Sequence, residues 1–480
     1  MAFLGIDIGT TGVRGAVFDD GARIVAHASE DCGTSAREGG QVEADACTWW
    51  AAVSRACTAL GSRVSLSKVE CVGVVGQAPT AVLVDADGRP LRPAILWLDV
   101  RASKEALAIT RALGPGRAES IGGNRVHPYF LGPKIAWLRA HEPLSVDRAA
   151  FVLQSHAFVV MRLTGVPTCD RSTAMLCAPL YDVAAQSWSE EGARAVGIAP
   201  HLLPPIARAE EVVGTVTAAA AAQTGLREGT PVVAGGGDFA ASALGAGVVE
   251  EGHASLMLGT AGNLLVPMAS PRFDTRLIHS HHVGCERWLA LGGTLCGAAL
   301  EWFRRTFAPG EDWRSLEGEA RAAGVGAGGV VMIPYLQGER TPIWDEHARG
   351  VFAGLDVRHG RGHLCRALIE GVALGFRDCL SVVEEGGVRL REAIASDGAG
   401  RNALLRQTLA DALEVPVVWD PESQTTVAGA ARLAAIGVGR GWKDVPSDGR
   451  IRHEPDPRAS TTLRELLRRR RAIYEALRLA

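Results

Sequence analysis

Residues 231–266 read PVVAGGGDFAASALGAGVVEEGHASLMLGTAGNLLV, and this stretch decides the fold that the rest of the chain implies. Its first apolar run ends in three glycines, Asp238 follows them directly, and the small residues at 240–247 look like the start of a packed helix. A second pair of apolar runs then turns over the sequence GTAG at 259–262. Glycines leave backbone N–H groups open to an anion, and threonine adds a hydroxyl donor. A carboxylate near such a turn suits phosphoryl transfer.

The N-terminus repeats this pattern. Residues 2–19 read AFLGIDIGTTGVRGAVFD, which predicts an apolar strand, a turn over GTTG at 9–12 and a returning strand. One such turn is a weak signal, but two of them between apolar strands form an internal repeat. The repeat predicts two similar α/β domains, each opening with a hairpin, with a phosphate held between the two turns. Two unrelated hairpins, whose glycines serve only the turn, are the alternative.

Asp7 lies near the end of the first predicted strand, among apolar neighbours such as Ile6 and Ile8. A carboxylate in such a position is costly to bury unless it is paired or binds a cation. With phosphates expected beside it, Mg²⁺ or its water shell is the partner that we expect. The alternative is a structural role, in which the carboxylate accepts hydrogen bonds from the turn's own N–H groups.

Two loops after predicted strands carry a candidate sugar site. The loop GQAPT at 76–80 offers an amide, and ILWLDVR at 95–101 offers an indole, an acid and a guanidinium. An indole stacks on the C–H face of a sugar, while amide and carboxylate groups bond its hydroxyls. The predicted sugar-binding residues are Gln77, Ala78, Trp97, Asp99 and Asp238. Taken singly, Trp97 is more typical of a core residue, and Asp99 with Arg101 is more typical of an ion pair.

Further along the chain, the apolar spacing predicts helices at 41–60 and 151–163, and a small-residue helix at 428–438 that can pack tightly. Asp170 either faces the sugar pocket or caps the next helix, and the cap is favoured. The stretch 334–355 mixes turn and charged residues between strands, which predicts an ordered loop. The basic run at 468–471 lies in a helical pattern and is predicted to be an exposed, solvated face.

The bulk composition excludes several classes of protein. The chain has 480 residues, of which 47% are apolar and 21% are charged, and its formal net charge is −3. This balance suits a folded chain of roughly two to four domains without a general attraction for nucleic acid or an anionic membrane. The ten cysteines form no CxxC pair, which favours a reducing compartment over a zinc or disulfide framework. Without a signal peptide or an apolar run of membrane length, we expect a cytoplasmic protein.

Together these motifs resemble the FGGY family of carbohydrate kinases, from Phe3 to about Gly439. GIDIGTTGVRGAVFD is similar to the family's first phosphate hairpin, LGTAGNL to its second, and GGGDFAASALG to the segment that carries the catalytic base. GERTPIWDEHARGVFAGL resembles the signature of the second domain, and SDGAGRNALLRQTLADALEVPV resembles the adenosine-binding turn. The resemblance implies an α/β fold of two similar actin/hexokinase/Hsp70-type ATPase domains, ribonuclease H-like, with a cleft between them. The expected domains are 1–246, with the sugar site and catalytic base, and 247–480, with the nucleotide site.

The resemblance also implies a role for each motif residue, with ATP and Mg²⁺ as cofactors. Asp238 would deprotonate the sugar hydroxyl, and Asp7 would act with Mg²⁺. The residues expected to bind ATP are Gly9, Thr10, Thr11, Gly259, Thr260, Gly398, Ala399 and Asn402. ILWLDVRA is similar to the xylulokinase pattern, so D-xylulose is the expected substrate, with ribulose, a deoxy-ketose or a tetritol as alternatives. A non-catalytic sugar or nucleotide sensor, or an ATP-driven chaperone or filament protein, are alternatives of other classes.

The chain departs from the family pattern at two places. Ala78 and Pro79 stand where xylulokinases usually carry Met-His, which removes an imidazole from the pocket and leaves the identity of the sugar open. Asp397 stands in a turn where a run of glycines is usual, so nucleotide affinity is expected to change without loss of the site. The expected partner is a small-molecule sugar, with neither nucleic acid nor membrane binding, and a homodimer is left open.

Overall fold

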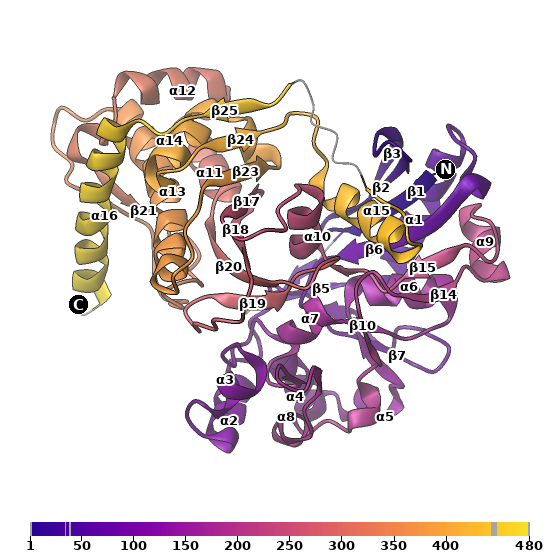
Figure 1. The fold of residues 1–480 in the computed structure, drawn as a ribbon. Helices are drawn as coiled ribbons and strands as arrows, with labels where there is room; N and C mark the ends of the chain where they lie inside the picture. The colour runs from indigo at the N-terminus through magenta and orange to yellow at the C-terminus, as the bar shows by residue number, and fades with distance from the viewer. Residues whose placement is uncertain (1, 34, 38–39, 443–448, 479–480) are drawn as a thin grey trace. The chain divides into compact units, whose positions relative to one another are not determined.

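The computed structural model describes residues 2–33, 35–37, 40–442 and 449–478. By its internal contacts the chain divides into two compact units (Figure 1). Unit 1 contains Met1–Val249, His279–Leu289 and Thr425–Val445, and unit 2 contains Glu250–Ile278, Ala290–Gln424 and Pro446–Ala480. The expected division at 246/247 puts residues 425–445 in the second domain, whereas their contacts put them in unit 1.

The first sheet has seven strands in the order β14-β15-β6-β1-β2-β3, with β16 also paired to β6. Its strands are β1 (Ala2–Ile8), β2 (Gly12–Asp19), β3 (Ile24–Asp31), β6 (Val69–Gly76), β14 (Val212–Thr215), β15 (Pro231–Val233) and β16 (Gly236–Gly237). The predicted N-terminal hairpin is confirmed, because β1 and β2 pair antiparallel with Asp7 opposite Arg14. On its other side β1 runs parallel to β6.

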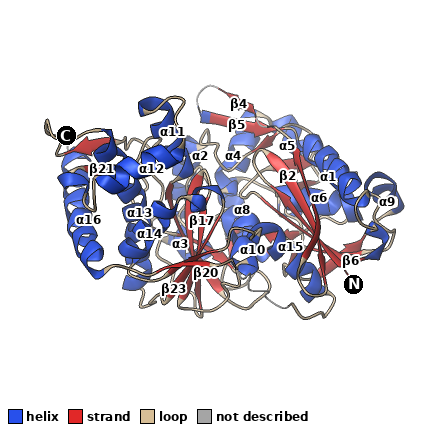
Figure 2. Ribbon diagram, turned by 90° about the horizontal axis from the view of Figure 1, so that it is seen from above, coloured by secondary structure: helices blue, strands red, loops and turns tan. Residues whose placement is uncertain are grey.

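Helices cover both faces of this sheet (Figure 2). On one face lie α1 (Ala46–Gly61) and α6 (Ser155–Thr164), since a Cβ added to Gly76 would meet Ser155 Oγ at 2.5 Å. On the opposite face lies α15 (Thr425–Gly437), where a Cβ on Gly73 would meet the Ala430 carbonyl oxygen at 1.9 Å. The backbone of α15 therefore rests directly on β6, with no side chain between them.

The same close approach joins α15 to α10 (Asp238–Gly245). A Cβ on Gly429 would meet the carbonyl oxygen of Ala241 at 1.9 Å, and one on Gly245 would meet that of Thr425 at 1.9 Å. The prediction that the small-residue helix near the C-terminus packs tightly is confirmed. Since α10 begins at Asp238, this packing fixes the helix that carries the candidate catalytic base.

The second sheet also has seven strands, in the order β19-β20-β18-β17-β23-β24-β25. These are β17 (His253–Leu258), β18 (Ala261–Met268), β19 (Ile278–His281), β20 (Trp288–Leu295), β23 (Glu392–Ser396), β24 (Val417–Trp419) and β25 (Ile451–His453). In the first sheet β1 is antiparallel to β2 and parallel to β6, β6 is parallel to β15, and the edge strand β14 is antiparallel to β15. The second sheet has the same pattern: β17 is antiparallel to β18 and parallel to β23, β23 is parallel to β24, and the edge strand β25 is antiparallel to β24. The repeat inferred from the two GTxG turns is thus confirmed as a repeat of strand topology.

The remaining elements surround these sheets. In unit 1 they are β4 (Ser35–Arg37), β5 (Gln41–Ala44), β7 (Val82–Val84), β8 (Ala94–Ile95), α2 (Ser103–Leu113), α3 (Arg117–Gly122), α4 (Leu131–His141), α5 (Pro143–Arg148), β9 (Phe151–Leu153), β10 (Cys169–Asp170), α7 (Arg171–Ala174), β11 (Tyr181–Asp182), β12 (Ser187–Trp188), α8 (Glu190–Val196), β13 (Ile206–Ala207) and α9 (Ala218–Thr224). In unit 2 they are α11 (Gly297–Phe307), α12 (Trp313–Ala322), β21 (Val331–Ile333), β22 (Val351–Ala353), α13 (Arg361–Glu385), α14 (Ala403–Leu413) and α16 (Pro457–Arg478). A second apolar cluster of unit 1 lies among α2, α4 and α8, apart from the core around the sheet.

Two predicted helices begin later than the sequence suggested. The stretch 41–60 opens with β5, and α1 starts only after Asp45, whose carboxylate accepts a hydrogen bond from the N–H of Cys47. The stretch 151–163 opens with β9, which pairs with β7 before α6 begins. In both places pairing with a distant strand outweighs the local helical pattern.

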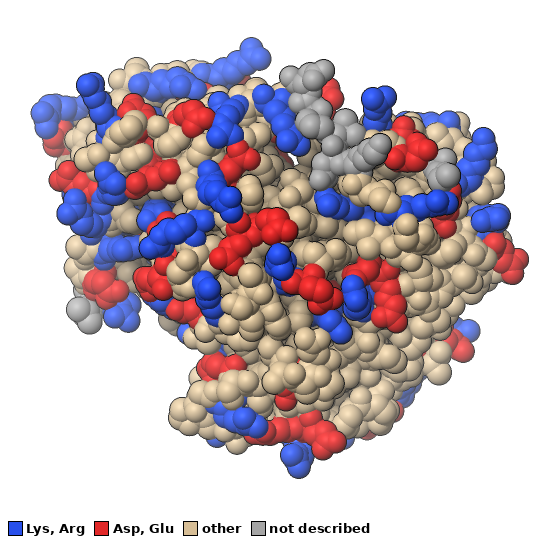
Figure 3. Space-filling view, in the orientation of Figure 1, with Lys and Arg blue, Asp and Glu red and all other residues tan. Residues whose placement is uncertain are grey.

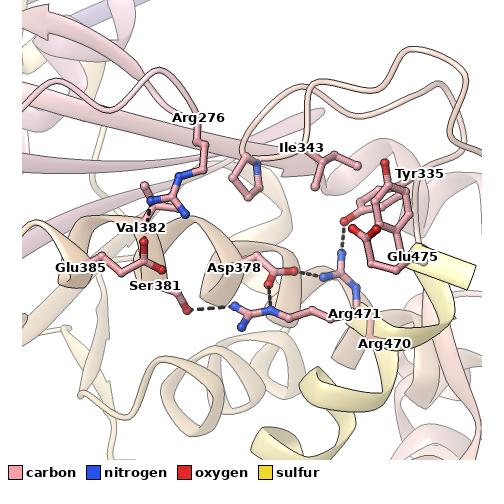
Figure 4. Close-up of a pocket in the computed structure, with 12 residues that line it drawn as sticks. Arg276, Tyr335, Ile343, Asp378, Ser381, Val382, Glu385, Arg470, Arg471 and Glu475 are labelled. Atoms are coloured by element: carbon pink, nitrogen blue, oxygen red, sulfur yellow. Dashed lines mark hydrogen bonds and ion pairs between the residues drawn. The ribbon is translucent and has the colours of Figure 1, made fainter. Parts of the chain in front are cut away.

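The basic run in α16 is exposed at three of its four positions, but Arg470 is only 2% exposed, so the prediction of a solvated face is wrong there. Arg470 shares its helix face with Leu463, Leu466 and Leu467, which are buried. Figure 4 shows it pointing to Asp378 of α13 and to Tyr335, whose hydroxyl accepts a hydrogen bond from it at 2.7 Å. Arg471 donates to the other Asp378 oxygen at 2.7 Å, so α16 is fastened to α13 beside a cavity of about 370 Å³.

The loop between β21 and β22 is held by a buried acid, as expected for an ordered loop. Glu339 accepts a hydrogen bond from the Thr294 hydroxyl at 2.7 Å and another from the Arg340 N–H at 3.0 Å. Burial raises the pKa of Glu339 to about 7, and these bonds together with the charges of Arg340 and Arg470 only partly oppose the rise. The carboxyl group therefore changes its charge near neutral pH.

This titration predicts a pH dependence of stability. Between about pH 4.5 and 7 the folded chain holds the Glu339 proton more tightly than the unfolded chain does. The stabilisation is complete below about pH 4.5 and is lost as the pH rises through 7, a change of about 3 kcal/mol. We expect Glu339→Gln, which stays neutral, to flatten the fall in Tm between about pH 5 and 8. The exposed Glu228→Gln is the matched control, and an equal slope in both variants would contradict the assignment.

On the face drawn in Figure 3, Lys and Arg side chains are interspersed with Asp and Glu, in line with the small net charge of −3. That face carries no broad patch of a single sign of charge.

In the described part of the chain, no helix combines the length and the hydropathy that a membrane span requires.

Candidate active site

The first phosphate turn lies on the wall of a cavity of about 480 Å³ in unit 1. Its lining residues are Asp7, Gly9, Thr10, Thr11, Gly12, Val13, Arg14, Ser29, Glu30, Asp31 and Arg55. The N–H of Gly9 donates to the carbonyl of Gly12 at 2.9 Å, which closes the turn and leaves Thr11 exposed at its tip. Asp7 is 5% exposed and lines the same cavity, so the acid and the turn lie together, as their spacing suggested.

Asp7 is the candidate magnesium ligand of this cavity. Protein-bound Mg²⁺ usually keeps several waters and takes one or two carboxylates together with substrate phosphates. Among the residues that the structure describes, no group of three or more His, Cys, Asp or Glu side chains could by itself hold a metal ion. Asp7, just before the phosphate turn, fits the shared mode of binding, in which the nucleotide provides other ligands.

Gln77 and Trp97, predicted to bind sugar, are both bonded to the first phosphate turn. The Trp97 indole N–H donates to Thr10 Oγ1 at 3.1 Å, and the Thr10 hydroxyl donates to Gln77 Oε1 at 3.2 Å. Gln77 Nε2 donates to the carbonyl of Gly9 at 3.3 Å, and the residue is only 1% exposed. Trp97 is half-buried, so part of its ring remains open to solvent, whereas the amide of Gln77 faces inward.

Asp99 has no surface with which to reach a sugar, since it is 0% exposed. Its carboxylate accepts hydrogen bonds from the N–H of Val42 at 2.6 Å and from the Arg101 guanidinium at 2.7–3.0 Å. Arg101 also pairs with Glu43 at 2.9 Å. Burial alone would raise the pKa of Glu43, but Arg92 and Arg101 hold it below its usual value. The ion pair that the sequence left as an alternative is therefore the observed arrangement, and it fixes the loop that bears Trp97.

Asp238 is the first residue of α10 and follows β16, which pairs with β6. Its side chain is partly exposed, and one carboxylate oxygen accepts the N–H of Phe239 at 2.7 Å. The preceding N–H, that of Gly237, donates to Ser172 Oγ at 3.2 Å, and Ser172 in turn donates to Asp170. A buried network thus holds the backbone on which the candidate base stands.

Asp170 caps α7, as the sequence favoured, and does not line an open pocket. It is 0% exposed, accepts the N–H of Ser172 at 2.7 Å and lies 3.2 Å from His156 Nε2. Burial would raise the pKa of this carboxyl, but His156 and the two hydroxyls of Ser172 and Thr173 hold it below its usual value. The sequence did not identify this network as support for Asp238, because its members come from separate segments.

The second phosphate turn, in unit 2, is bonded to the start of α11. The carbonyl of Gly259 accepts the N–H of Gly297 at 2.9 Å, and the carbonyl of Thr260 accepts the N–H of Ala298 at 3.1 Å. The Thr260 side chain is exposed. No motif had marked α11, although its small first residues allow this contact, since a Cβ on Gly297 would meet the Gly259 carbonyl oxygen at 2.6 Å.

The predicted adenosine turn lines a cavity of about 430 Å³ in unit 2. Its lining residues are Gly297, Leu300, Glu301, Trp313, Arg314, Glu317, Gly398, Ala399, Arg401 and Asn402. Asn402 caps α14 through its side-chain oxygen Oδ1, which accepts the N–H of Leu405 at 2.9 Å, while its buried side-chain nitrogen Nδ2 makes no hydrogen bond within the described chain. A purine or ribose acceptor would satisfy that donor. Trp313 and Arg314 were missed, because α12 carries no motif.

Asp397 opens this turn in a backbone conformation that suits glycine. Its φ of 69° and ψ of −178° lie in a region that is essentially restricted to glycine and costs other residues about 1–3 kcal/mol. Its carboxylate lies 4.0 Å from the position that a Cβ on Gly259 would take, so its charge stands beside the second phosphate turn.

We expect Asp397→Gly to raise the free energy of unfolding by about 1–3 kcal/mol and to tighten nucleotide binding, because it removes both strain and a negative charge. Thermal melts and calorimetric titration with Mg²⁺ and an ATP analogue measure the two effects. Glu414→Gly is the control, since Glu414 has an ordinary left-handed conformation (φ 62°, ψ 27°) at the end of α14. A gain no larger than that of the control would contradict the assignment of strain.

The chain matches known proteins over most of its length. The N-terminal domain model of the FGGY family of carbohydrate kinases matches residues 2–245, and its C-terminal domain model matches residues 254–438. The chain is 32% identical over 444 residues to a xylulose kinase of Bacillus subtilis (strain 168), covering 91% of this chain and 88% of that protein. It is 34% identical over 440 residues to a xylulose kinase of Escherichia coli (strain K12), covering 90% of each. The crystal structure of xylulose kinase from Rhodospirillum rubrum superposes with a TM-score of 0.91 at 33% identity, over 100% of this chain and 99% of that one.

Proposed function

Because the chain belongs to the FGGY family of carbohydrate kinases, we propose that it transfers the γ-phosphoryl group of ATP to a primary hydroxyl of a small ketose or polyol. The fold class expected from the sequence is confirmed, and the chain is a carbohydrate kinase. D-xylulose is the substrate that we propose first, with D-xylulose 5-phosphate and ADP as products. The observation that carries this choice is the identity of 32–34% to two xylulose kinases over nine-tenths of the chain.

In the proposed reaction Asp238 is the general base. Its carboxylate accepts the proton of the sugar hydroxyl as that oxygen bonds to the γ-phosphorus and the bond to the ADP oxygen breaks. The partly exposed position at the start of α10 and the buried network behind Gly237 support this role. Mg²⁺ bound with the nucleotide neutralises phosphate charge, and Asp7 is the ligand that we propose for it.

Each unit has residues that we propose for nucleotide binding. The turns at 9–12 and 259–262 provide backbone N–H groups for its phosphates, with Thr11 and Thr260 as exposed hydroxyl donors. Gly398, Ala399 and Asn402 line the cavity proposed for the adenosine. The open part of the Trp97 ring and the wall at Ala78 are proposed to face the sugar, whereas Gln77 and Asp99 support that site from behind.

One observation favours a second sugar as an alternative substrate. Ala78 and Pro79 have no polar side-chain atoms, and their carbonyl oxygens face the buried hydroxyl of Tyr129 and the Lys134 ammonium, each at 3.4 Å. A sugar hydroxyl opposite this wall therefore finds few groups to bond. Ribulose, a deoxy-ketose or a tetritol remains the alternative substrate for this reason.

The proposal is tested with a panel of ketopentoses, their deoxy analogues and tetritols, by following ADP release with and without each sugar. An apolar wall discriminates by about 10–10²-fold, whereas a pocket that bonds a hydroxyl discriminates by about 10⁴–10⁵-fold. We expect epimers that differ at the carbon facing residues 78 and 79 to have kcat/KM within about a hundredfold of each other. A preference above about 10⁴ at every carbon would contradict this selectivity. The absence of sugar-dependent ADP release with all of them would overturn the proposed function.

A further inference from the structure

The hydroxyl of Thr10 donates one hydrogen bond and accepts another inside unit 1. A threonine hydroxyl has one proton to donate and lone pairs with which to accept. Its proton points to Gln77 Oε1 at 3.2 Å, and it accepts the indole N–H of Trp97 at 3.1 Å. In this arrangement the hydroxyl cannot donate to a phosphate without giving up Gln77. Thr11 lies at the exposed tip of the turn.

Several hydrogen bonds hold Gln77 in place against the turn. Its backbone N–H donates to the carbonyl of Ile8 at 2.9 Å, and its own carbonyl accepts the hydroxyls of Ser155 at 2.7 Å and Thr80 at 3.2 Å. Its side chain spans the turn, because Nε2 reaches the Gly9 carbonyl while Oε1 accepts from Thr10. At 1% exposure, the amide is set against the turn rather than toward solvent.

Trp97 stands on a loop that is fixed independently. Before Trp97, the N–H of Leu96 donates to the Val42 carbonyl at 3.1 Å, and after it the buried Asp99 carboxylate binds Arg101. Arg101 in turn pairs with Glu43, which also binds Arg92 at 2.6 Å. The indole N–H therefore approaches Thr10 from a rigid support, as a positioning group should.

From this geometry, and resting on the proposed function, we infer that Trp97 and Gln77 are positioning residues for the first phosphate turn and act through the Thr10 hydroxyl. They hold the backbone N–H groups at 9–12 in place for the nucleotide. The loop expected to serve the sugar thus also sets nucleotide affinity. The specific consequence is that loss of the indole N–H weakens nucleotide binding.

The test is a double-mutant cycle of Trp97→Phe and Thr10→Val, with calorimetric titration of Mg²⁺ and a non-hydrolysable ATP analogue as the readout. We expect each single variant to raise the nucleotide Kd by about three- to tenfold, the effect of one lost hydrogen bond. In the Thr10→Val background, Trp97→Phe should have no further effect. Thr10→Ser, which keeps the hydroxyl, should bind like the parent. Because the Trp97 ring is also proposed to face the sugar, the nucleotide Kd and not the sugar KM is the deciding readout for Trp97→Phe.

Trp188→Phe is the matched control. This variant also loses an indole N–H bond within unit 1, because Trp188 donates to the Pro204 carbonyl at 2.7 Å. Trp188 lies in β12, outside the loop that bears Trp97, so its loss should leave the nucleotide Kd unchanged. An effect of Trp97→Phe on the nucleotide Kd that persists unchanged in the Thr10→Val background overturns the inference, and so does a nucleotide Kd that Trp97→Phe leaves unchanged. If Trp97→Phe does not fold, Gln77→Met is combined with Thr10→Val instead. Because Gln77 also bonds the Gly9 carbonyl, its effect should shrink but not vanish in the Thr10→Val background, and an effect of undiminished size overturns the inference. A parent protein that binds no Mg²⁺-nucleotide would overturn the proposed function itself.

Discussion

Asp238→Asn is expected to lower kcat by about 10²–10⁴-fold, the usual contribution of a general base, while folding and nucleotide binding stay close to those of the parent. The asparagine has nearly the same shape and can still accept the Phe239 N–H that bonds Asp238 at 2.7 Å. The start of α10 should therefore be preserved, and only the ability to take the sugar proton is lost. Steady-state kinetics with the best sugar of the panel, together with calorimetric nucleotide binding, measure both sides of this expectation.

The control for this variant is Asp20→Asn, which makes the same chemical change at an exposed position after β2. It should have the kinetic constants of the parent. Turnover of Asp238→Asn within about threefold of the parent would rule out its role as the base. A large loss of nucleotide binding would instead place Asp238 in the nucleotide site.

The second large effect concerns folding. We expect Gly73→Ala to lower the free energy of unfolding by about 2–4 kcal/mol, because the added methyl group has no room. It would lie 1.9 Å from the carbonyl oxygen of Ala430 and 2.8 Å from the carbonyl carbon, so the backbone of α15 has to move away from β6. Since α15 also packs on α10, this shift should lower kcat in the folded fraction as well.

Gly318→Ala is the matched control for this substitution. Gly318 lies inside α12, and a Cβ there meets nothing within 4 Å, so alanine should raise stability by up to about 1 kcal/mol. Thermal melts of the two variants should therefore shift in opposite directions. If Gly73→Ala melted at the same temperature as Gly318→Ala, the direct contact between α15 and β6 would be wrong.

Much of the architecture could be predicted from the sequence, because its signals are local. The alternation of apolar residues on either side of GTTG at 9–12 and GTAG at 259–262 specifies two hairpins. Three glycines before Asp238 place an acid where a strand gives way to a helix, and the structure has that order, with β16 ending at Gly237 and α10 starting at Asp238. The repeat of these signals was sufficient to predict two similar units.

The candidate site was predicted in its parts but not in its connections. Asp7 and the first turn were expected together because five residues or fewer separate them, and they line one cavity. Gln77 and Trp97 were expected to face a sugar from their chemistry, yet their polar atoms bond the turn at Gly9 and Thr10. The chemistry of a side chain limits which hydrogen bonds it can make, but the fold determines which partner lies near it.

The sequence by itself determined the two hairpins, the passage from strand to helix at Asp238, and the residue types of the phosphate turns, since each depends on neighbours along the chain. Tertiary structure alone decided that α15 packs on the first sheet, that Arg470 is buried against Asp378, and that β9 is a strand. Each of these depends on contacts between segments far apart in the sequence. The free energy of such contacts is a property of the packed chain, which local propensity does not contain.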